Sequence, residues 1–175
     1  DTQGPVDICE VICGSQFFYY LYDYPDLMKQ FLDLITETYI IFMREWYKIV
    51  PHKLEGYASH WSMLHKGRIT LRNDSLMNLS EDMYMEFVRP YDQRLFDEFG
   101  GGIIHYCGKG DHFARAMSEM NQLYGVNLSQ PHLNDMEHIF RNTVDKGIPI
   151  VGFSAGWIRE NRHAGRDFHG LMHAP

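Results

Sequence analysis

The sequence predicts an α/β protein built around a parallel β-sheet. Strand-like apolar runs alternate with helical patterns along the chain, an order typical of β-α-β units with right-handed crossovers. Glycines follow several of the helical patterns, where they favour a helix end. The chain has 175 residues, of which 45% are hydrophobic and 22% are charged, an ordinary globular composition. There is no internal repeat and no low-complexity linker, so we expect a single domain over residues 1–175.

The longest predicted helix covers residues 25–50, because its side chains repeat with a period of three to four. The repeating side chains are Leu27, Phe31, Leu34, Ile35, Thr38, Ile41, Phe42 and Trp46. Pro25 suits the first turn of a helix, and Pro51 marks its end. Two β-prone segments follow, at residues 56–62 and 67–71.

A second helix is expected over residues 80–99. Ser80 is a good N-cap, and Pro90 should kink or split the helix because it removes a hydrogen bond and crowds the preceding turn. Three glycines at positions 100–102 end the helical pattern. The apolar run at 103–107 is bounded by glycines on both sides, which predicts a buried strand.

The C-terminal part of the chain continues the alternation. We expect a helix over 111–123 that Gly125 ends, a short strand at 126–128, a helix over 134–146 and a strand at 148–151. The remaining segment is polar and poorly periodic, and we expect one last helix and a terminal strand near Leu171.

Two architectures fit this alternation, an open doubly wound sheet and part of a (β/α)8 barrel. A complete barrel typically needs about 250 residues, which is more than this chain has. The chain begins with Asp1 rather than Met, so we expect it to be a piece of a longer protein. A Rossmann-type dinucleotide site is not supported, because glycines 100–102 precede a strand whereas a phosphate loop follows one.

Charge and cysteine content argue against several function classes. The formal net charge is −7 and there is no block of Lys or Arg, so we expect no nucleic-acid partner. No apolar run approaches the roughly 18 residues of a membrane-spanning helix, and residues 1–20 lack the basic start of a signal peptide. The three cysteines are too few and too uneven for a secreted disulfide framework. We therefore expect a reduced, cytoplasmic protein without a membrane partner.

The sharpest local feature is the segment His105-Tyr106-Cys107-Gly108. Residues i and i+2 of a strand share a face, so His105 and Cys107 should project together. They lie at the carboxyl end of a strand, where α/β proteins build their sites. Imidazole and thiolate are both zinc ligands, and a catalytic zinc takes three protein ligands. From the spacing alone, a buried cysteine beside a hydrogen-bonded core histidine is the commoner arrangement, because His-x-Cys is short and unspecific.

Other candidate residues follow predicted strands. Asp74 comes after the segment 67–71 and could bind a cation, a substrate amine or a proton, although an Asx turn or a cap is the commoner role. Gln130 and Asn134 follow a strand end, and we take them as candidate substrate-binding residues that could equally be turn and cap residues. The loop at 108–112 could hold an anion at a helix start, or be an ordinary connection.

The stretch from residue 67 to residue 152 resembles the uroporphyrinogen decarboxylase superfamily. Within that superfamily it is most similar to the zinc-dependent branch of methyltransferases that work with cobalamin or another corrinoid. The matching text is GRITLRNDSLMNLSEDMYMEFVRPYDQRL, GGGIIHYCGKGDHF, LSQPHLNDME and DKGIPIVG, and upstream Gly4-Pro5, Ile12-Cys13-Gly14 and the Pro25 helix. The family fold is a (β/α)8 TIM barrel. The resemblance therefore implies that residues 1–175 are its C-terminal half or somewhat more, a partial barrel of about five to six βα units.

The resemblance also implies a site. In the methyltransferase branch, zinc is held by His-x-Cys and a distant downstream cysteine, and His105 and Cys107 match the first two ligands. No cysteine follows Cys107, so His173 is the residue that could replace the third ligand. The zinc would lower the pKa of a bound thiol, which would take a methyl group from a corrinoid carrier. Asp74 matches an acidic position that faces the pocket, and we take it as the candidate catalytic residue.

The leading expectation is thus an enzyme that transfers a methyl group between a methylated small molecule or corrinoid carrier and a thiol, with a corrinoid protein as partner. One alternative is cofactor-free decarboxylation of a tetrapyrrole in porphyrin biosynthesis. That chemistry uses arginines and an aspartate from the family's first strands, and it gives the His-x-Cys pair no role. The other alternative is a truncated, non-catalytic binding module. In each case, exposed strand edges would favour a homo-oligomer.

Overall fold

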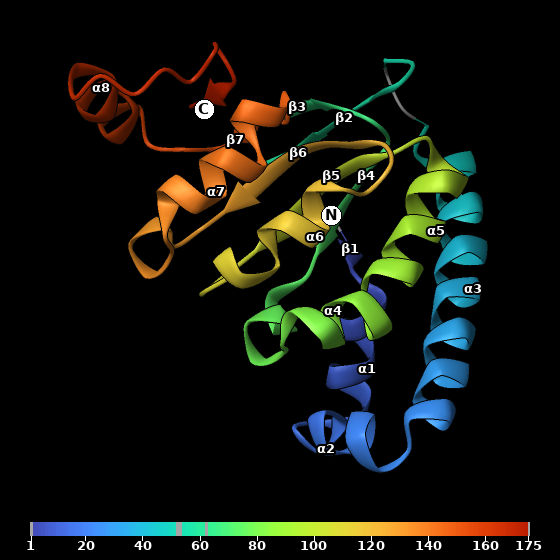
Figure 1. Cartoon of the computed structure of the whole chain (residues 1–175). Helices are drawn as coiled ribbons and strands as arrows, with labels where there is room; N and C mark the ends of the chain where they lie inside the picture. The colour runs from blue at the N-terminus through green and yellow to red at the C-terminus, as the bar shows by residue number, and fades with distance from the viewer. Residues whose placement is uncertain (1, 52–53, 62, 175) are drawn as a thin grey trace.

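The computed structural model describes residues 2–51, 54–61 and 63–174. Its centre is a six-stranded sheet whose strands follow chain order, β1-β4-β5-β6-β7-β8, and every pairing is parallel (Figure 1). The strands are β1 (Thr2–Gln3), β4 (Ile69–Arg72), β5 (Gly102–Tyr106), β6 (Leu123–Leu128), β7 (Ile150–Val151) and β8 (Met172–His173). The predicted α/β class with a parallel sheet is confirmed. The strand order lacks the reversal of a doubly wound sheet and is compatible with part of a barrel.

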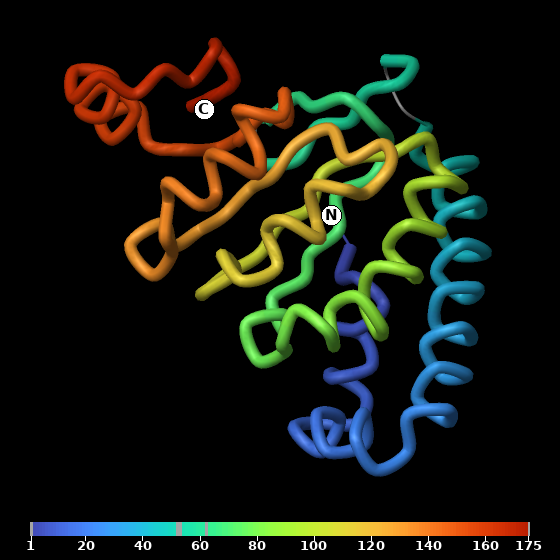
Figure 2. The backbone as a smooth tube through the Cα atoms, in the orientation of Figure 1, coloured from blue at the N-terminus to red at the C-terminus, as the bar shows by residue number. Residues whose placement is uncertain are grey.

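Helices flank this sheet. They are α1 (Pro5–Cys13), α2 (Gln16–Asp23), α3 (Pro25–Ile49), α4 (Glu81–Phe87), α5 (Arg89–Phe99), α6 (Ala114–Ser118), α7 (Met136–Asn142) and α8 (Ala155–His163), with 3-10 turns η1 (Asp74–Asn78), η2 (Asp111–Phe113), η3 (Pro131–Leu133) and η4 (Val144–Lys146). The long helix α3 lies beside α5 on one side of the molecule, and α8 lies with the C-terminus on the other (Figure 2). Among the described residues, no helix has both the length and the apolarity needed to cross a bilayer.

Helix boundaries in the first half follow the predicted signals. The helix expected at residues 25–50 is α3. The helix expected at 80–99 is split at Pro90, because α4 ends before this residue and α5 begins with it in the first turn, where a missing N–H is tolerated. The Ser80 hydroxyl accepts a hydrogen bond from the Met83 N–H at 3.2 Å, so Ser80 is the predicted N-cap.

The helix predicted over residues 111–123 is present over its first part, as η2 and α6, but its predicted end is wrong. The helical segment ends at Ser118, and β6 already begins at Leu123. Gly125 lies inside this strand rather than at a helix end. A Cβ atom at Gly125 would come 3.0 Å from the Ile103 side chain, so the glycine allows β5 and β6 to pack closely.

Two later elements also differ in detail from the prediction. The helix expected over 134–146 is the shorter α7 followed by η4, and its N-cap is Asp135 rather than Asn134. The last helix and the terminal strand near Leu171 are present as α8 and β8.

An antiparallel hairpin of β2 (Tyr57–His60) and β3 (Met63–Lys66) is inserted between α3 and β4. The β-prone segment at 56–62 includes β2, but β3 was not predicted. The sequence carries no alternation of apolar and polar residues there, because apolar Leu64 is exposed and polar His65 is buried. Met63 of the hairpin packs against Ile103 and Val151, so the hairpin covers one face of the sheet.

The central strand β5 separates two environments. Ile104 and Tyr106 belong to the main hydrophobic core together with residues of the helices. Ile103 and His105 alternate with them and therefore point to the opposite face, which the hairpin covers. The predicted site residues thus lie on the hairpin face of the sheet.

Candidate metal centre

Polar side chains form a row across the carboxyl end of the sheet. Arg72 of β4 pairs with His105 of β5, and His105 pairs with Asn127 of β6. Neighbouring residues at one level of a sheet point to the same face, so this row lies on the hairpin face. Asp74 and Cys107 follow Arg72 and His105 by two residues. They lie just beyond the strand ends, where α/β proteins place their sites.

Three potential ligand atoms converge here. One ligand atom each from Asp74, His105 and Cys107 lies within 4.8 Å of the other two. The His105 Nε2 atom is 3.4 Å from Asp74 Oδ1 and 3.6 Å from Cys107 Sγ. The imidazole is buried, whereas the carboxylate and the thiol are partly exposed. The structure therefore brings the predicted pair together and adds Asp74 to it.

The orientation of the His105 ring follows from Asn127. The Asn127 Nδ2 group donates to the Val151 carbonyl at 2.6 Å, which places Oδ1 of the same amide against His105 Nδ1. An amide oxygen only accepts, so Nδ1 carries the hydrogen. In the neutral ring, the lone pair then lies on Nε2, the atom that faces Asp74 and Cys107. Metal-binding histidines are commonly oriented by such a second hydrogen bond.

The Asp74 carboxylate is held by several donors. Its Oδ2 accepts from Arg72 Nη2 at 2.8 Å, and its Oδ1 accepts from the Cys107 backbone N–H at 2.9 Å. Burial acts to raise the pKa of Asp74, but the hydrogen bonds from Arg72 and Cys107 and the charge of Arg72 outweigh it and hold the pKa below its usual value. Asp74 is therefore an anion at neutral pH.

The turn that carries Asp74 is anchored from the first helix. Asp7 of α1 accepts hydrogen bonds from the backbone N–H groups of Asp74 at 2.8 Å and Ser75 at 3.0 Å. Burial raises the pKa of Asp7 despite these hydrogen bonds. Asp7 could not be predicted as a site residue, because nothing in the local pattern around it indicates a contact with a residue 67 positions away.

The pKa of the Cys107 thiol is shifted upward, in contrast to the lowered pKa of Asp74. Burial raises its pKa, the Ser129 hydroxyl lowers it and the Asp74 carboxylate raises it again, and the net effect is an increase. The sulfur of the protein alone therefore keeps its proton at neutral pH. A bound divalent cation would replace that proton.

The two candidate substrate-binding residues contact a loop. Gln130 Oε1 accepts from the Gly108 N–H at 2.5 Å. Asn134 Oδ1 accepts from the Gly110 N–H at 2.7 Å, and its Nδ2 group donates to the Gly108 and Gln130 carbonyls at 2.9 Å. Both amides thus position the loop that follows Cys107. A direct role in substrate binding stays a prediction.

His173 lies far across the sheet from the three potential ligand atoms. It is on β8, which is separated from β5 by β6 and β7. Three strand spacings correspond to about 14 Å along a sheet. The structure therefore offers Asp74 rather than His173 as the third donor.

A cavity of about 440 Å³ adjoins the cluster. Trp61, at the tip of the hairpin, packs edge-on against the His105 ring with 5.0 Å between ring centroids. Phe153 and Trp157 also line the cavity and contact each other at 4.8 Å. The described lining residues carry no charged side chain. The cavity therefore suits an uncharged, apolar group beside the potential ligand atoms.

Comparisons with known proteins do not assign a family to this chain. No protein-family model matches it, and no curated protein matches it in sequence. The resemblance to the uroporphyrinogen decarboxylase superfamily stays a prediction, and a function must be argued from the site.

Proposed function

We propose that the chain binds zinc through His105, Cys107 and Asp74 and that this centre serves methyl transfer to a thiol. The observation that carries the proposal is the convergence of three different donor atoms at the carboxyl ends of parallel strands, with the histidine held in the tautomer that presents Nε2. The methyl transfer itself is taken from the resemblance described above.

The donor set fits zinc better than the other common divalent cations. Zinc accepts nitrogen, sulfur and carboxylate oxygen in one site, whereas magnesium and calcium prefer oxygen alone. Three protein donors leave one position for a substrate, which is the arrangement of a catalytic rather than a structural site. A zinc ion held there would lower the pKa of a thiol that binds beside it.

Each surrounding residue has a definite part in this scheme. Asn127 keeps the hydrogen on His105 Nδ1, and Arg72 holds one oxygen of Asp74. Trp61 and Trp157 border the uncharged cavity in which the transferred group would lie. In the transfer, the thiol would release its proton to solvent and its sulfur would form a bond to the methyl carbon, while the cobalt–carbon bond of the corrinoid carrier would break and leave its electron pair on cobalt.

The cavity also favours methyl transfer over tetrapyrrole decarboxylation. A tetrapyrrole with several carboxylates needs cationic side chains around it, because buried carboxylates must be paired. The described cavity lining has none. The one arginine in the row, Arg72, already pairs with Asp74 at 2.8 Å.

Metal analysis of the purified chain tests the metal centre. We expect one zinc ion per chain in the wild type and its loss in His105→Ala, Cys107→Ala and Asp74→Ala. The partly buried Cys13 and the exposed His132 offer matched controls, and Cys13→Ala and His132→Ala should keep the metal. Absence of zinc from the wild type, or equal zinc in all five variants, would overturn the metal centre.

Methylcobalamin and a small thiol test the reaction separately. The zinc-loaded chain should form the methyl thioether, and His105→Ala should lose this activity. Zinc binding without thioether formation would leave the metal centre standing and reject methyl transfer. Decarboxylation of a tetrapyrrole by a chain that holds no zinc would instead support the alternative activity.

A further inference from the structure

Aromatic side chains form much of the wall of the cavity beside the candidate metal centre. They come from two distant parts of the chain, with Trp61 at the tip of the hairpin and Phe153 and Trp157 around the start of α8. Met63 and Leu128 add further apolar surface. Aromatic rings pack against other rings by offset stacking or edge contacts, which adds to the gain from burying their area. The lining is therefore suited to a ligand that itself contains a ring.

The cavity opens on the three potential ligand atoms, because its lining residues contact the same side chains. Trp61 packs edge-on against the His105 ring, and the Asn127 amide oxygen accepts from the same imidazole. The Ser129 hydroxyl interacts with the Cys107 thiol. All three of these contacting residues line the cavity. A molecule whose sulfur is bound beside the ligand atoms would therefore extend the rest of its structure into the cavity.

Trp61 occupies its place at a conformational cost. Its backbone φ angle is 45°, in the left-handed region. A bulky residue is a clear outlier there, and hairpin turns with a positive φ normally carry glycine, asparagine or aspartate. Backbone strain of this kind is concentrated at functional sites. The indole ring of Trp61 is therefore what this position of the turn retains at the expense of an easier backbone.

The rings of both tryptophans are held in place by neighbouring side chains. The Trp61 ring lies 4.1 Å from the His60 ring and 5.8 Å from the Arg72 guanidinium, measured to its centroid. Trp157 packs against three phenylalanine rings, namely Phe140, Phe153 and Phe168. Trp61 is nevertheless 54% exposed, and Trp157 is partly exposed. Both rings thus offer free surface in a fixed orientation, which lowers the entropic cost of binding a ligand.

Charge excludes many small thiols from the cavity. Its described lining residues are uncharged, and the Arg72 guanidinium beside Trp61 is already paired with Asp74 at 2.8 Å. A carboxylate, sulfonate or ammonium group would enter this cavity without a counter-charge, which is unfavourable. We propose that the thiol accepted at this centre is uncharged and carries an aromatic ring, which the cavity binds against Trp61 and Trp157. This inference rests on the proposed function and names its substrate class.

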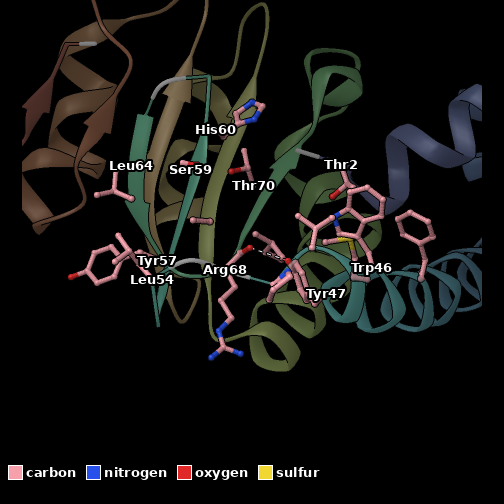
Figure 3. Close-up of a pocket in the computed structure, with 16 residues that line it drawn as sticks. Thr2, Trp46, Tyr47, Leu54, Tyr57, Ser59, His60, Leu64, Arg68 and Thr70 are labelled. Atoms are coloured by element: carbon pink, nitrogen blue, oxygen red, sulfur yellow. Dashed lines mark hydrogen bonds between the residues drawn. The ribbon is translucent and has the colours of Figure 1, made fainter.

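The chain contains three tryptophans, at positions 46, 61 and 157, and their fluorescence can report binding. Trp46 lines a separate groove of about 540 Å³ between the end of α3 and the hairpin, where Figure 3 shows it near Thr2 and Tyr47. Trp46→Phe therefore leaves the two tryptophans of the cavity as the emitting residues. This variant is the matched control and should bind every ligand as the wild type does.

Three thiols test the substrate class on the zinc-loaded Trp46→Phe chain. Phenylmethanethiol has an uncharged aromatic ring, cyclohexylmethanethiol has a ring that is not aromatic, and 3-mercaptopropanoate has a carboxylate. We expect phenylmethanethiol to bind about fivefold more tightly than the cyclohexyl compound and roughly a hundredfold more tightly than the carboxylate. Equal affinities for the three thiols would overturn the proposal.

Trp61→Asn, made in the Trp46→Phe chain, removes the ring and gives the turn a residue that suits its backbone. Affinity for phenylmethanethiol should fall about tenfold while affinity for 3-mercaptopropanoate changes little. The melting temperature, followed by circular dichroism, should stay near that of the control. Trp61→Phe keeps a ring and should retain the preference for the aromatic thiol. A lower melting temperature with an unchanged preference in Trp61→Asn would assign Trp61 a structural role only and refute its part in recognition.

Benzyl alcohol tests the cavity without zinc, because it carries the aromatic ring and no thiol. The metal-free Trp46→Phe chain should bind it in the millimolar range, and the added Trp61→Asn change should abolish this binding. Failure of benzyl alcohol to bind would overturn the aromatic site even in a chain that holds zinc. Binding of benzyl alcohol by a chain that never takes up zinc would reject the metal centre and support the aromatic site on its own.

Discussion

The hydrogen bond from His105 to Asn127 offers the sharpest test of how the candidate metal centre is built. Asn127 accepts from His105 Nδ1 and donates to the Val151 carbonyl at 2.6 Å. Asn127→Leu removes both hydrogen bonds at a buried position and leaves two polar groups without a partner. Each such group costs about 1–3 kcal/mol, so the free energy of unfolding should fall by about 2–6 kcal/mol.

Zinc affinity should fall in the same variant for a separate reason. Without Asn127 the His105 ring can rotate and can place its hydrogen on Nε2, the atom that faces Asp74 and Cys107. Loss of such a supporting hydrogen bond typically weakens metal binding by about 10–100-fold. Competition with a chromogenic zinc chelator measures this loss, and urea unfolding of the metal-free chain measures the stability.

Asn127→Asp separates orientation from packing. An aspartate keeps an oxygen against His105 Nδ1, so zinc affinity should stay within a few-fold of the wild type. Its second oxygen would face the Val151 carbonyl, and this repulsion should destabilise the fold. If Asn127→Leu binds zinc as tightly as the wild type, or if Asn127→Asp loses as much affinity as Asn127→Leu, then Asn127 does not select the histidine tautomer.

Two further predictions concern buried carboxyl groups. Asp7→Asn places an NH₂ group against one of the Asp74 and Ser75 N–H groups and should weaken zinc binding about tenfold. Asp135→Asn, at the N-cap of α7, is the control and should leave zinc binding unchanged. Competition with the zinc chelator measures the affinity of both variants. Burial raises the pKa of Asp92, which accepts a hydrogen bond from Asn73, to about 8. The folded chain then binds a proton that the unfolded chain releases, so stability should fall by up to about 1.4 kcal/mol per pH unit from about pH 4 to about pH 8. Asp92→Asn should flatten this slope in urea unfolding, and an unchanged slope would assign it to other groups.

The sequence predicts the part of the candidate site that is formed by residues close together in the chain. His105 and Cys107 share a face because side chains alternate along a strand, and two residues of one strand need no knowledge of the rest of the fold. Asp74 joins them only because β4 pairs with β5 in the register that sets Arg72 beside His105. Register is a long-range property, so the sequence could mark Asp74 as a candidate but could not show that it is a neighbour.

Helix α3 shows a second limit of sequence patterns. The apolar period predicted a helix correctly, because the period reports a conformation. The period does not report which face is buried, and here Leu34 and Ile41 are exposed while Leu32 and Met43 are buried. The helix predicted over 111–123 ends early, at Ser118, and Leu123 already pairs with Gly102 of β5, a long-range contact that the local pattern does not report.

The contact between Asp7 and the η1 turn connects the candidate centre to the N-terminal helices. Asp7 receives the N–H groups of Asp74 and Ser75, and the Glu10 carboxylate of the same helix receives the Ser75 hydroxyl. The position of one donor atom therefore depends on α1, which packs against α3.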